Sequence, residues 1–277
     1  MELDQLSVVI VTFRSEDKIN SCLGSIPTNI PVILVENSNN VDFKKKIENQ
    51  FSNVECILTG GNNGYAVANN IGLGKVKTKY ALVLNPDAII KKDTIENFLK
   101  ITDQYNDFWL IGPVNNQANK DIIDRPETFE VNDLKGFAIF FNLVKFKGSY
   151  FDENFFLYFE EIDLCRKVKK NKGKIFLSKK IMIDHEGSGS VRKDDKLEFE
   201  KNRNWHWMWS TFYFHKKYKG FFVALIIMLP NLFTSLFKTF FYQIIFNTQK
   251  RDIYFCRLSG IINSIIGKKS WYRPSID

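Results

Sequence analysis

Short apolar segments alternate with segments of helical pattern through the first hundred residues, and this alternation limits the fold more than any other feature of the sequence. Each apolar segment is five to eight residues long and rich in β-branched residues, as expected for a strand buried on both faces. Strands that alternate with helices at this spacing form βαβ units. The pattern therefore predicts an α/β fold with a mostly parallel sheet flanked by helices. The four predicted strands are Leu6–Phe13, Pro31–Glu36, Val54–Thr59 and Tyr80–Leu84.

The later part of the chain continues the same pattern less regularly. We expect a strand at Trp109–Gly112, a strand running into a helix at Leu134–Phe146, and a helix at Leu164–Asn171. Two short strand-like pieces follow, Lys174–Leu177 and Ile181–His185. From Lys193 onward the pattern is helical.

Polar residues follow each of the four predicted strands. Right-handed crossovers place the carboxyl ends of parallel strands at one edge of the sheet, where ligands bind. We therefore expect these residues to line one crevice. They are Arg14 and Ser15, Glu36–Asn40, Gly60–Gly64, and Asn85–Asp87.

Asn85-Pro86-Asp87 stands at the end of the fourth strand. Carboxylate and amide oxygens are the ligands that Mg²⁺ or Mn²⁺ prefers, and such ions commonly hold substrate phosphates as well. A simple strand-ending turn explains the same three residues equally well.

The segment GGNNGYAVANN, residues 60–70, is neither a Walker motif nor a GxGxxG motif. It can present backbone N–H groups and the amides of Asn69 and Asn70 to a nucleotide near a helix start. A glycine turn with helix-capping asparagines is the alternative. His185 follows an apolar run, where it can ligate a metal or bind a phosphate, or simply bond to the backbone. We interpret His206 and His215, which lie among aromatic and basic residues, as interfacial.

A strongly aromatic run, Phe151–Phe159, leads directly into the carboxylates Glu160, Glu161 and Asp163. Carboxylates beside apolar groups are costly to ionise, so their pKa values rise, which suits a general base that deprotonates a hydroxyl. A helix N-terminus that favours negative charge is the alternative interpretation. The residues alone leave both open.

The positive charge is concentrated at the C-terminal end of the chain. Residues 1–200 hold 27 Lys and Arg against 29 Asp and Glu, whereas residues 201–277 hold 12 basic and 2 acidic residues. Four of the five tryptophans lie in residues 201–277 too. Basic charge, tryptophan and long apolar runs are typical of a segment that lies on an anionic bilayer. Nucleic acid would attract the charge but would not explain the uncharged run Phe221–Phe237.

A spanning helix needs about 20 apolar residues. Pro230 and Asn231 interrupt the run Phe221–Phe237, and Lys238 and Gln243 interrupt the apolar residues that follow it. We therefore favour helices in the membrane interface over a transmembrane span, with a homo-oligomer interface as the alternative. The predicted division is a catalytic domain at residues 1–195 and a basic, aromatic-rich amphipathic helical region at residues 196–277. The four cysteines form no CxxC pair, which disfavours a zinc site and suits a reducing compartment. No signal peptide precedes the first strand, so we expect the N-terminal part in the cytoplasm.

Six segments, taken in order, resemble family 2 glycosyltransferases of the GT-A fold, above all the rhamnosyltransferase-like enzymes of bacterial surface polysaccharide synthesis. The resemblance covers roughly residues 5–220. The matching segments are VVIVTF, LVENSN, GGNNGYAVANN, LVLNPDAII, FDENFFLYFEEIDLCRKV and IDHEGSGSV.

The resemblance implies inverting transfer of a sugar from a dTDP- or UDP-linked donor to a hydroxyl of a lipid-linked saccharide, at the cytoplasmic face of the membrane. It implies that Glu161 is the catalytic base, with Glu160 beside it in the substrate site. It also implies a divalent cation, Mg²⁺ or Mn²⁺, held by Asp87 and His185. The remaining substrate-binding positions that it implies are Thr12, Phe13, Glu36 and Asn37 for the nucleoside, together with Gly64, Asn69, Asn70 and Asn85.

Three positions depart from the family pattern. Asn85 replaces the first carboxylate of the metal motif, which should weaken metal affinity. Glu161 is one methylene longer than the usual Asp, and Glu36 also stands where Asp is more common. The QxxRW signature of processive members is absent, which favours addition of a single sugar.

Two other classes fit parts of the sequence. A sugar nucleotidylyltransferase needs a basic, glycine-rich loop near the N-terminus, and the turn Thr12–Glu16 has no glycine. A non-catalytic membrane scaffold that retains the fold is compatible with the altered motif at Asn85. Release of nucleoside diphosphate distinguishes an enzyme from a scaffold.

Overall fold

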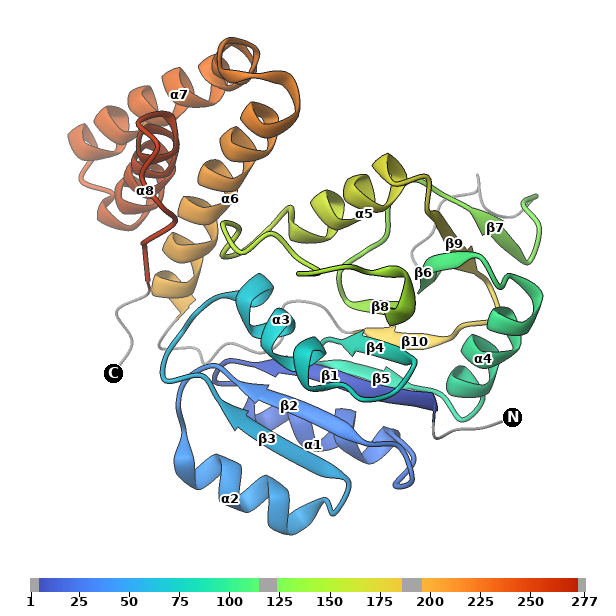
Figure 1. Ribbon diagram of the computed structural model, residues 1–277. Coiled ribbons are helices and arrows are strands. Elements are labelled where there is room, and N and C mark those ends of the chain that lie inside the picture. The colour runs from blue at the N-terminus through green and yellow to red at the C-terminus, as the bar shows by residue number, and fades with distance from the viewer. Residues whose placement is uncertain (1–4, 115–123, 186–195, 274–277) are drawn as a thin grey trace. The chain divides into compact units, whose positions relative to one another are not determined.

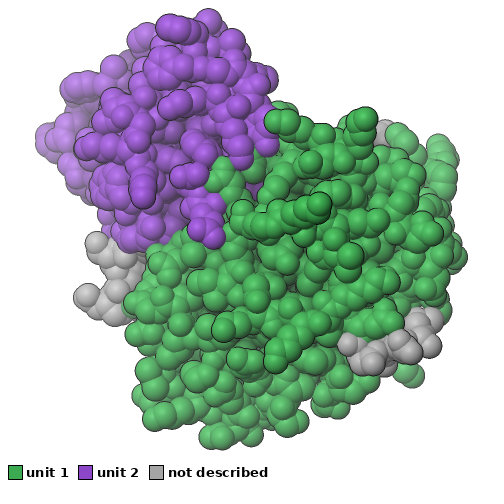
Figure 2. All heavy atoms as spheres, in the orientation of Figure 1, with its two compact units in different colours: residues 1–152, 161–190 green, residues 153–160, 191–277 purple. Residues whose placement is uncertain are grey.

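The computed structural model describes residues 5–114, 124–185 and 196–273 (Figure 1). The chain divides into two compact units, coloured separately in Figure 2. Unit 1 consists of residues 1–152 and 161–190, and unit 2 of residues 153–160 and 191–277. The glycine-serine loop after His185 lies outside the described residues.

The centre of unit 1 is an eight-stranded sheet with the order β3-β2-β1-β4-β8-β6-β9-β7. Its first four strands run parallel, with β1 between β2 and β4. The predicted α/β fold with a mostly parallel sheet is confirmed. These strands are β1 (Leu6–Thr12), β2 (Val32–Glu36), β3 (Val54–Leu58) and β4 (Tyr80–Leu84).

Strand β8 (Ala138–Asn142) runs antiparallel between β4 and β6, which breaks the parallel pattern. The prediction of a helix after this strand was wrong: only a single 3₁₀ turn, η3 (Leu143–Lys145), follows it. The remaining strands of the sheet are β6 (Phe108–Pro113), β7 (Thr128–Glu130) and β9 (Lys174–Ser178).

A separate two-stranded sheet joins β5 (Ala88–Ile90) to β10 (Ile183–His185). The pairing is antiparallel, and His185 stands opposite Ala88. It links the segment that follows β4 to a segment almost a hundred residues farther along the chain.

Helices cover both faces of the large sheet, because alternate residues of the buried strands point to opposite faces. On one face, Val8 and Leu34 pack with α1 (Glu16–Ser25), α2 (Val41–Gln50) and α4 (Thr94–Gln104). On the other, Val9 and Val35 pack with α3 (Tyr65–Lys75) and α5 (Glu160–Lys170). Both layers are visible in Figure 1.

Unit 2 is built on three helices, α6 (Lys196–Lys219), α7 (Phe221–Ile244) and α8 (Thr248–Ile265). Gly260 lets α8 approach α6 closely, since a Cβ there would lie 2.3 Å from the carbonyl oxygen of Trp205. Within the described residues, α7 is the one helix long and apolar enough to cross a membrane, with a mean hydropathy of 1.8.

His206 on α6 is fully buried, so the interpretation of this residue as interfacial was wrong. Its Nε2 lies 2.9 Å from the carbonyl oxygen of Tyr272, and its ring stacks on Phe156. Burial lowers the pKa of His206 to about 3, so the ring is neutral. His206 therefore helps to hold the segment at Tyr272 against α6.

The packing of α3 on the sheet allows a direct test with two glycines of the same helix. A Cβ at Gly72 would lie 2.4 Å from Val9 Cγ1, whereas a Cβ at Gly74 meets nothing within 4 Å. We expect Gly72→Ala to lower the free energy of unfolding by about 1–3 kcal/mol, because overpacking strains the sheet contact. Gly74→Ala should raise it by up to about 1 kcal/mol.

Urea denaturation followed by circular dichroism compares the two variants. Equal midpoints for Gly72→Ala and Gly74→Ala would contradict this packing of α3 on β1.

Candidate active site

Asp87 and His185 are brought together by the pairing of β5 with β10. Asp87 immediately precedes β5, and the register places His185 beside it, opposite Ala88. His185 Nε2 lies 3.3 Å from Asp87 Oδ1, and the Asp87 side chain is only 9% exposed. The hydrogen bond from His185 lowers the pKa of Asp87, which burial would otherwise raise. Asp87 is therefore a carboxylate at neutral pH.

Asn85 and Phe137 complete the surroundings of the His185 ring. Asn85 Nδ2 lies 3.5 Å from His185 Nε2. The Phe137 ring stacks on the imidazole, with ring centroids 4.8 Å apart. Asn85 is fixed in turn, since its backbone N–H donates to the Phe137 carbonyl oxygen over 2.9 Å. A carboxylate, an imidazole and an amide thus lie in contact after β4.

Glu161 lies in the first turn of α5, which begins at Glu160 and not at Leu164 as predicted. Burial raises the pKa of Glu161, and the charge of Asp133 adds to the effect. Hydrogen bonds from the backbone at the helix start and the charge of Lys135 oppose it. Both sequence interpretations therefore apply: the acid is at a helix N-terminus, and it is also costly to ionise.

The loop before β8 connects Glu161 to the Asp87 cluster. Gly136 lies against the Glu161 side chain, because a Cβ there would be 3.6 Å from Glu161 Cγ. The next residue, Phe137, carries the ring that stacks on His185. Glu161 thus contacts Gly136, and the ring of His185, which bonds to Asp87, contacts the next residue, Phe137.

Tyr65, which the sequence analysis did not select, strengthens this connection. Its hydroxyl donates to the Gly136 carbonyl oxygen over 2.9 Å and lies 3.4 Å from Asn85 Oδ1. An aromatic residue directly after Gly64 is the one sequence feature that marks this position, and it does not indicate that Asn85 and Gly136 are its partners. Tyr65 ties the start of α3 to both halves of the cluster.

Glu36 and Asn37, predicted to bind the nucleoside, form hydrogen bonds within the protein. The Glu36 carboxylate is 1% exposed and accepts hydrogen bonds from Ser38 and Asn40, which closes the turn before α2. Asn37 is 2% exposed. Its amide donates to the Gly64 carbonyl oxygen and accepts from the Asn63 backbone, both over 3.0–3.3 Å. The two side chains therefore order the turns that follow β2 and β3.

Asn69 and Asn70 also make contacts within the protein. Asn70 pairs with the backbone of Phe151 through two hydrogen bonds of 2.9 Å, which fixes the chain that leads to α5. Asn69 is fully buried and donates to the Tyr65 carbonyl oxygen. Gly64 adopts φ +85° at the N-cap of α3, a conformation that side chains rarely adopt.

Thr12 and Phe13 end β1. Thr12 is 1% exposed, and its carbonyl oxygen accepts from the Asn37 backbone over 2.8 Å. Phe13 is only half-buried. Of these two predicted nucleoside-binding residues, Phe13 offers the more accessible side chain.

The chain enters α5 through an unusual backbone that unit 2 holds in place. Tyr158 and Phe159 both have positive φ, 71° and 73°, which costs on the order of 1–3 kcal/mol each. The Trp207 ring on α6 packs against both, with centroids 5.2 and 5.4 Å away. Ser210 Oγ donates to the Leu157 carbonyl oxygen over 2.8 Å. These contacts, all within unit 2, fix the chain as far as Glu160, which is itself buried.

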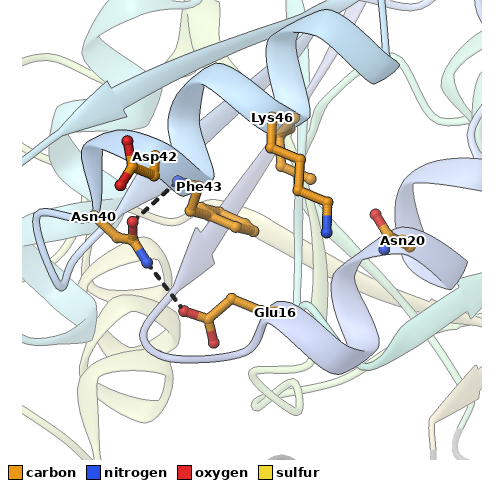
Figure 3. Close-up of a pocket in the computed structure, with 7 residues that line it drawn as sticks. Glu16, Asn20, Asn40, Asp42, Phe43 and Lys46 are labelled. Carbon is orange, nitrogen blue, oxygen red and sulfur yellow. Dashed lines mark hydrogen bonds between the residues drawn. The ribbon is translucent and has the colours of Figure 1, made fainter.

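A pocket of about 240 Å³ lies elsewhere, between α1 and α2 (Figure 3). Phe43 forms part of its wall, and Asn40 donates to Glu16 across it. Of the residues predicted to line the crevice, Asn40 lines this pocket, but none of the predicted catalytic, substrate-binding or metal-binding residues does. Because its two carboxylates, Glu16 and Asp42, face a single lysine, Lys46, it is a poor site for a diphosphate.

The described residues contain no group of three or more His, Cys, Asp or Glu side chains that could hold a metal ion. Asp87 and His185 therefore form a pair of metal-ligand types, with the Asn85 amide beside them. Any cation at this pair would need further ligands from a substrate or water.

Residues 7–166 match the family described as "Glycosyl transferase family 2". The chain belongs to this family. The matched residues include β1 to β4, the Asp87 motif and Glu161, so they contain most of the geometry described above. The resemblance to family 2 glycosyltransferases is confirmed.

Two proteins are similar in sequence to this family 2 member. One is the low-salt glycan biosynthesis hexosyltransferase Agl10 of Haloferax volcanii, 26% identical over 195 residues, which covers 61% of this chain and 62% of that protein. The other is an uncharacterized glycosyltransferase of Haemophilus influenzae, 28% identical over 106 residues, which covers 36% of this chain and 42% of that protein. The alignments thus span less than two thirds of either relative.

Solved structures confirm the fold. TarS of S. aureus (residues 1–349), solved in complex with UDP, superimposes with a TM-score of 0.55 at 17% identity and covers 99% of this chain and 94% of that chain. GalNAc-T7, solved with UDP, GalNAc and Mn²⁺, gives a TM-score of 0.54 at 13% identity and covers 68% of this chain and 45% of that chain. The GT-A-like architecture is shared at these low identities.

The burial of Glu161 predicts a measurable effect on stability. Since the pKa of Glu161 is raised in the folded state, ionised Glu161 lowers the free energy of unfolding. This penalty develops as pH rises from the ordinary value of 4.5 through the raised pKa. We expect Glu161→Gln to unfold at a higher temperature than the parent at pH 7, with the difference vanishing at low pH.

Thermal unfolding between pH 4 and pH 8 measures this difference. The matched control is Glu55→Gln, because Glu55 is an exposed residue of β3. A lower unfolding temperature for Glu161→Gln at pH 7 would show that burial does not penalise the ionised carboxylate.

Proposed function

We propose that this family 2 enzyme is an inverting, non-processive glycosyltransferase that moves a sugar from a nucleotide diphosphate to an acceptor hydroxyl. The observation that carries the proposal is the placement of a half-buried glutamate, Glu161, against the same loop as the Asp87–His185 pair. One group is suited to take a proton and the other to meet a diphosphate. The residues of this domain, 1–195 in the proposed division, supply both.

Glu161 acts as the general base. Its raised pKa places the carboxylate nearer to neutral pH, where a base is both ionised and able to accept a proton. It takes the proton from the acceptor hydroxyl as the oxygen attacks the anomeric carbon. The C–O bond forms on the face opposite the leaving diphosphate, so the configuration inverts, as in single displacement by glycosidases.

Asp87 and His185 fit a divalent cation. Their donor atoms are 3.3 Å apart, which is short enough for both to reach one ion at about 2.1 Å each. Bound there, Mn²⁺ or Mg²⁺ would supply positive charge to the departing diphosphate. With carboxylate, imidazole and amide side chains, the site has one negative charge, so we expect modest affinity for the ion in the absence of donor.

The substrates are proposed from chemistry and from the relatives. TarS has been solved with UDP and with UDP-GlcNAc, which supports a UDP- or dTDP-linked donor. The hexosyltransferase relative acts in glycan biosynthesis, which supports a hexose or deoxyhexose such as rhamnose. We propose a lipid-linked saccharide as acceptor, at the cytoplasmic face of the membrane, where residues 201–277 would meet the bilayer.

Glu161→Gln keeps the size of the side chain and removes the base. We expect turnover to fall by about 10²–10⁴-fold, as for other general bases, while UDP still protects the variant against thermal unfolding. In the parent, the rate should fall as pH drops through the raised pKa of Glu161, because the protonated acid cannot accept a proton. The assay measures release of nucleoside diphosphate from candidate donors with Mn²⁺, with Glu55→Gln as control.

Near-normal turnover of Glu161→Gln would remove Glu161 from the mechanism. Absence of nucleoside diphosphate release by the parent with every donor that protects it, and with acceptor present, would favour a non-catalytic scaffold.

A further inference from the structure

Helix α7 presents one continuous apolar face that unit 2 leaves uncovered. Its exposed residues recur at intervals of three, four and seven, so they form a stripe along one side of the helix. The stripe residues are Phe222, Ile226, Phe233, Phe237, Phe240 and Ile244, each between 63% and 77% exposed. Four aromatic rings and two branched chains in such an arrangement form a continuous apolar patch, unlike the single apolar residues that are scattered over an ordinary surface.

The opposite side of α7 is already used inside unit 2. Ala224 and Met228 pack with Met208 and Phe212 of α6 and with Ile261 of α8. The one charged residue of α7, Lys238, donates to the Tyr254 hydroxyl of α8 over 2.9 Å. The stripe is therefore free of charge along its length.

Positive charge borders both ends of the stripe. Lys216, Lys217 and Lys219 are exposed just before α7, and Lys250 is exposed at the start of α8. From residue 201 to residue 251 the sequence contains no Asp or Glu. An apolar stripe between two basic ends complements a surface that combines acyl chains with anionic headgroups.

The packing of α7 disfavours a transmembrane arrangement. Its inner side is bonded to α8, which carries Arg251, Asp252 and Arg257. If α7 crossed the bilayer with these contacts intact, α8 and its charges would enter the hydrocarbon region at high cost. Packing of the stripe against a second copy of the chain is unfavourable as well, because the lysines that border the two stripes would repel one another.

We infer that the α7 stripe docks in the interface of an anionic phospholipid bilayer, with α7 parallel to the membrane plane. This deepens the proposed function, since it rests on an acceptor that is lipid-linked, and it names the surface that meets the lipid. It does not depend on which sugar is transferred.

Vesicle flotation of the full chain tests the inference, with vesicles of neutral phosphatidylcholine or of the same lipid containing phosphatidylglycerol. We expect the parent to bind the anionic vesicles at least tenfold more tightly than the neutral ones, and to be released by alkaline carbonate. The double variant Phe233→Glu and Phe237→Glu should lose at least tenfold in binding. Val144→Glu, at an exposed apolar residue of unit 1, should bind like the parent.

The charge component has its own matched pair of variants. Replacing Lys216, Lys217 and Lys219 by Gln should weaken binding to anionic vesicles severalfold, whereas the same change at exposed Lys45, Lys75 and Lys77 of unit 1 should not. Equal loss in the two triple variants would show a dependence on net charge alone and would overturn the assignment to α7.

Two other results would overturn the inference. Resistance to carbonate would indicate a spanning helix, and a self-association that only the Phe233→Glu and Phe237→Glu variant abolishes would indicate a second copy. Protection of each variant by UDP against thermal unfolding is measured in parallel. Loss of vesicle binding with UDP protection intact separates failure of the membrane face from failure of the sugar-transfer proposal.

Discussion

The pairing of β5 with β10 is the contact on which the candidate site depends. Three residues on each strand join the end of the Asp87 motif to His185, almost a hundred residues later. Without this register, the carboxylate of Asp87 would lose the hydrogen bond that lowers its pKa. The imidazole would also lose its stacking on Phe137, the residue next to the glycine that contacts Glu161.

Opposed electrostatic effects meet at Glu161. The start of α5 stabilises negative charge through its backbone N–H groups, whereas burial penalises it, and the net result is a raised pKa. The protein thus separates two acids by environment: a hydrogen bond from His185 lowers the pKa of Asp87, whereas burial raises the pKa of Glu161. The proposed sugar transfer uses such a division between the group that would meet the diphosphate and the group that would take the proton.

The sequence predicted the parallel core well and the connections around it poorly. Strands β1, β2 and β4 are fully buried, largely apolar runs, and β3 is buried in part, so hydrophobicity marks them. Strands β5 and β7 have three residues each, too few for a periodic signal, and the antiparallel direction of β8 depends on pairing with distant strands. Residue types pointed to Asp87, His185 and Glu161. The Gly136 partner of Tyr65 and the Phe151 partner of Asn70 lie 71 and 81 residues away and depend on packing, so they could not be read from the chain. The bonds of Glu36 are local, but the residue types do not show that the turn after β2 uses this carboxylate.

A crystal structure of the protein with UDP and Mn²⁺ would test the central claim most directly, because anomalous scattering locates manganese without ambiguity. We expect a manganese peak about 2.0–2.3 Å from Asp87 Oδ1 and His185 Nε2. The diphosphate should lie on the side of this pair that faces Gly136 and Glu161. Manganese and diphosphate bound away from this pair, for example in the pocket between α1 and α2, would contradict it.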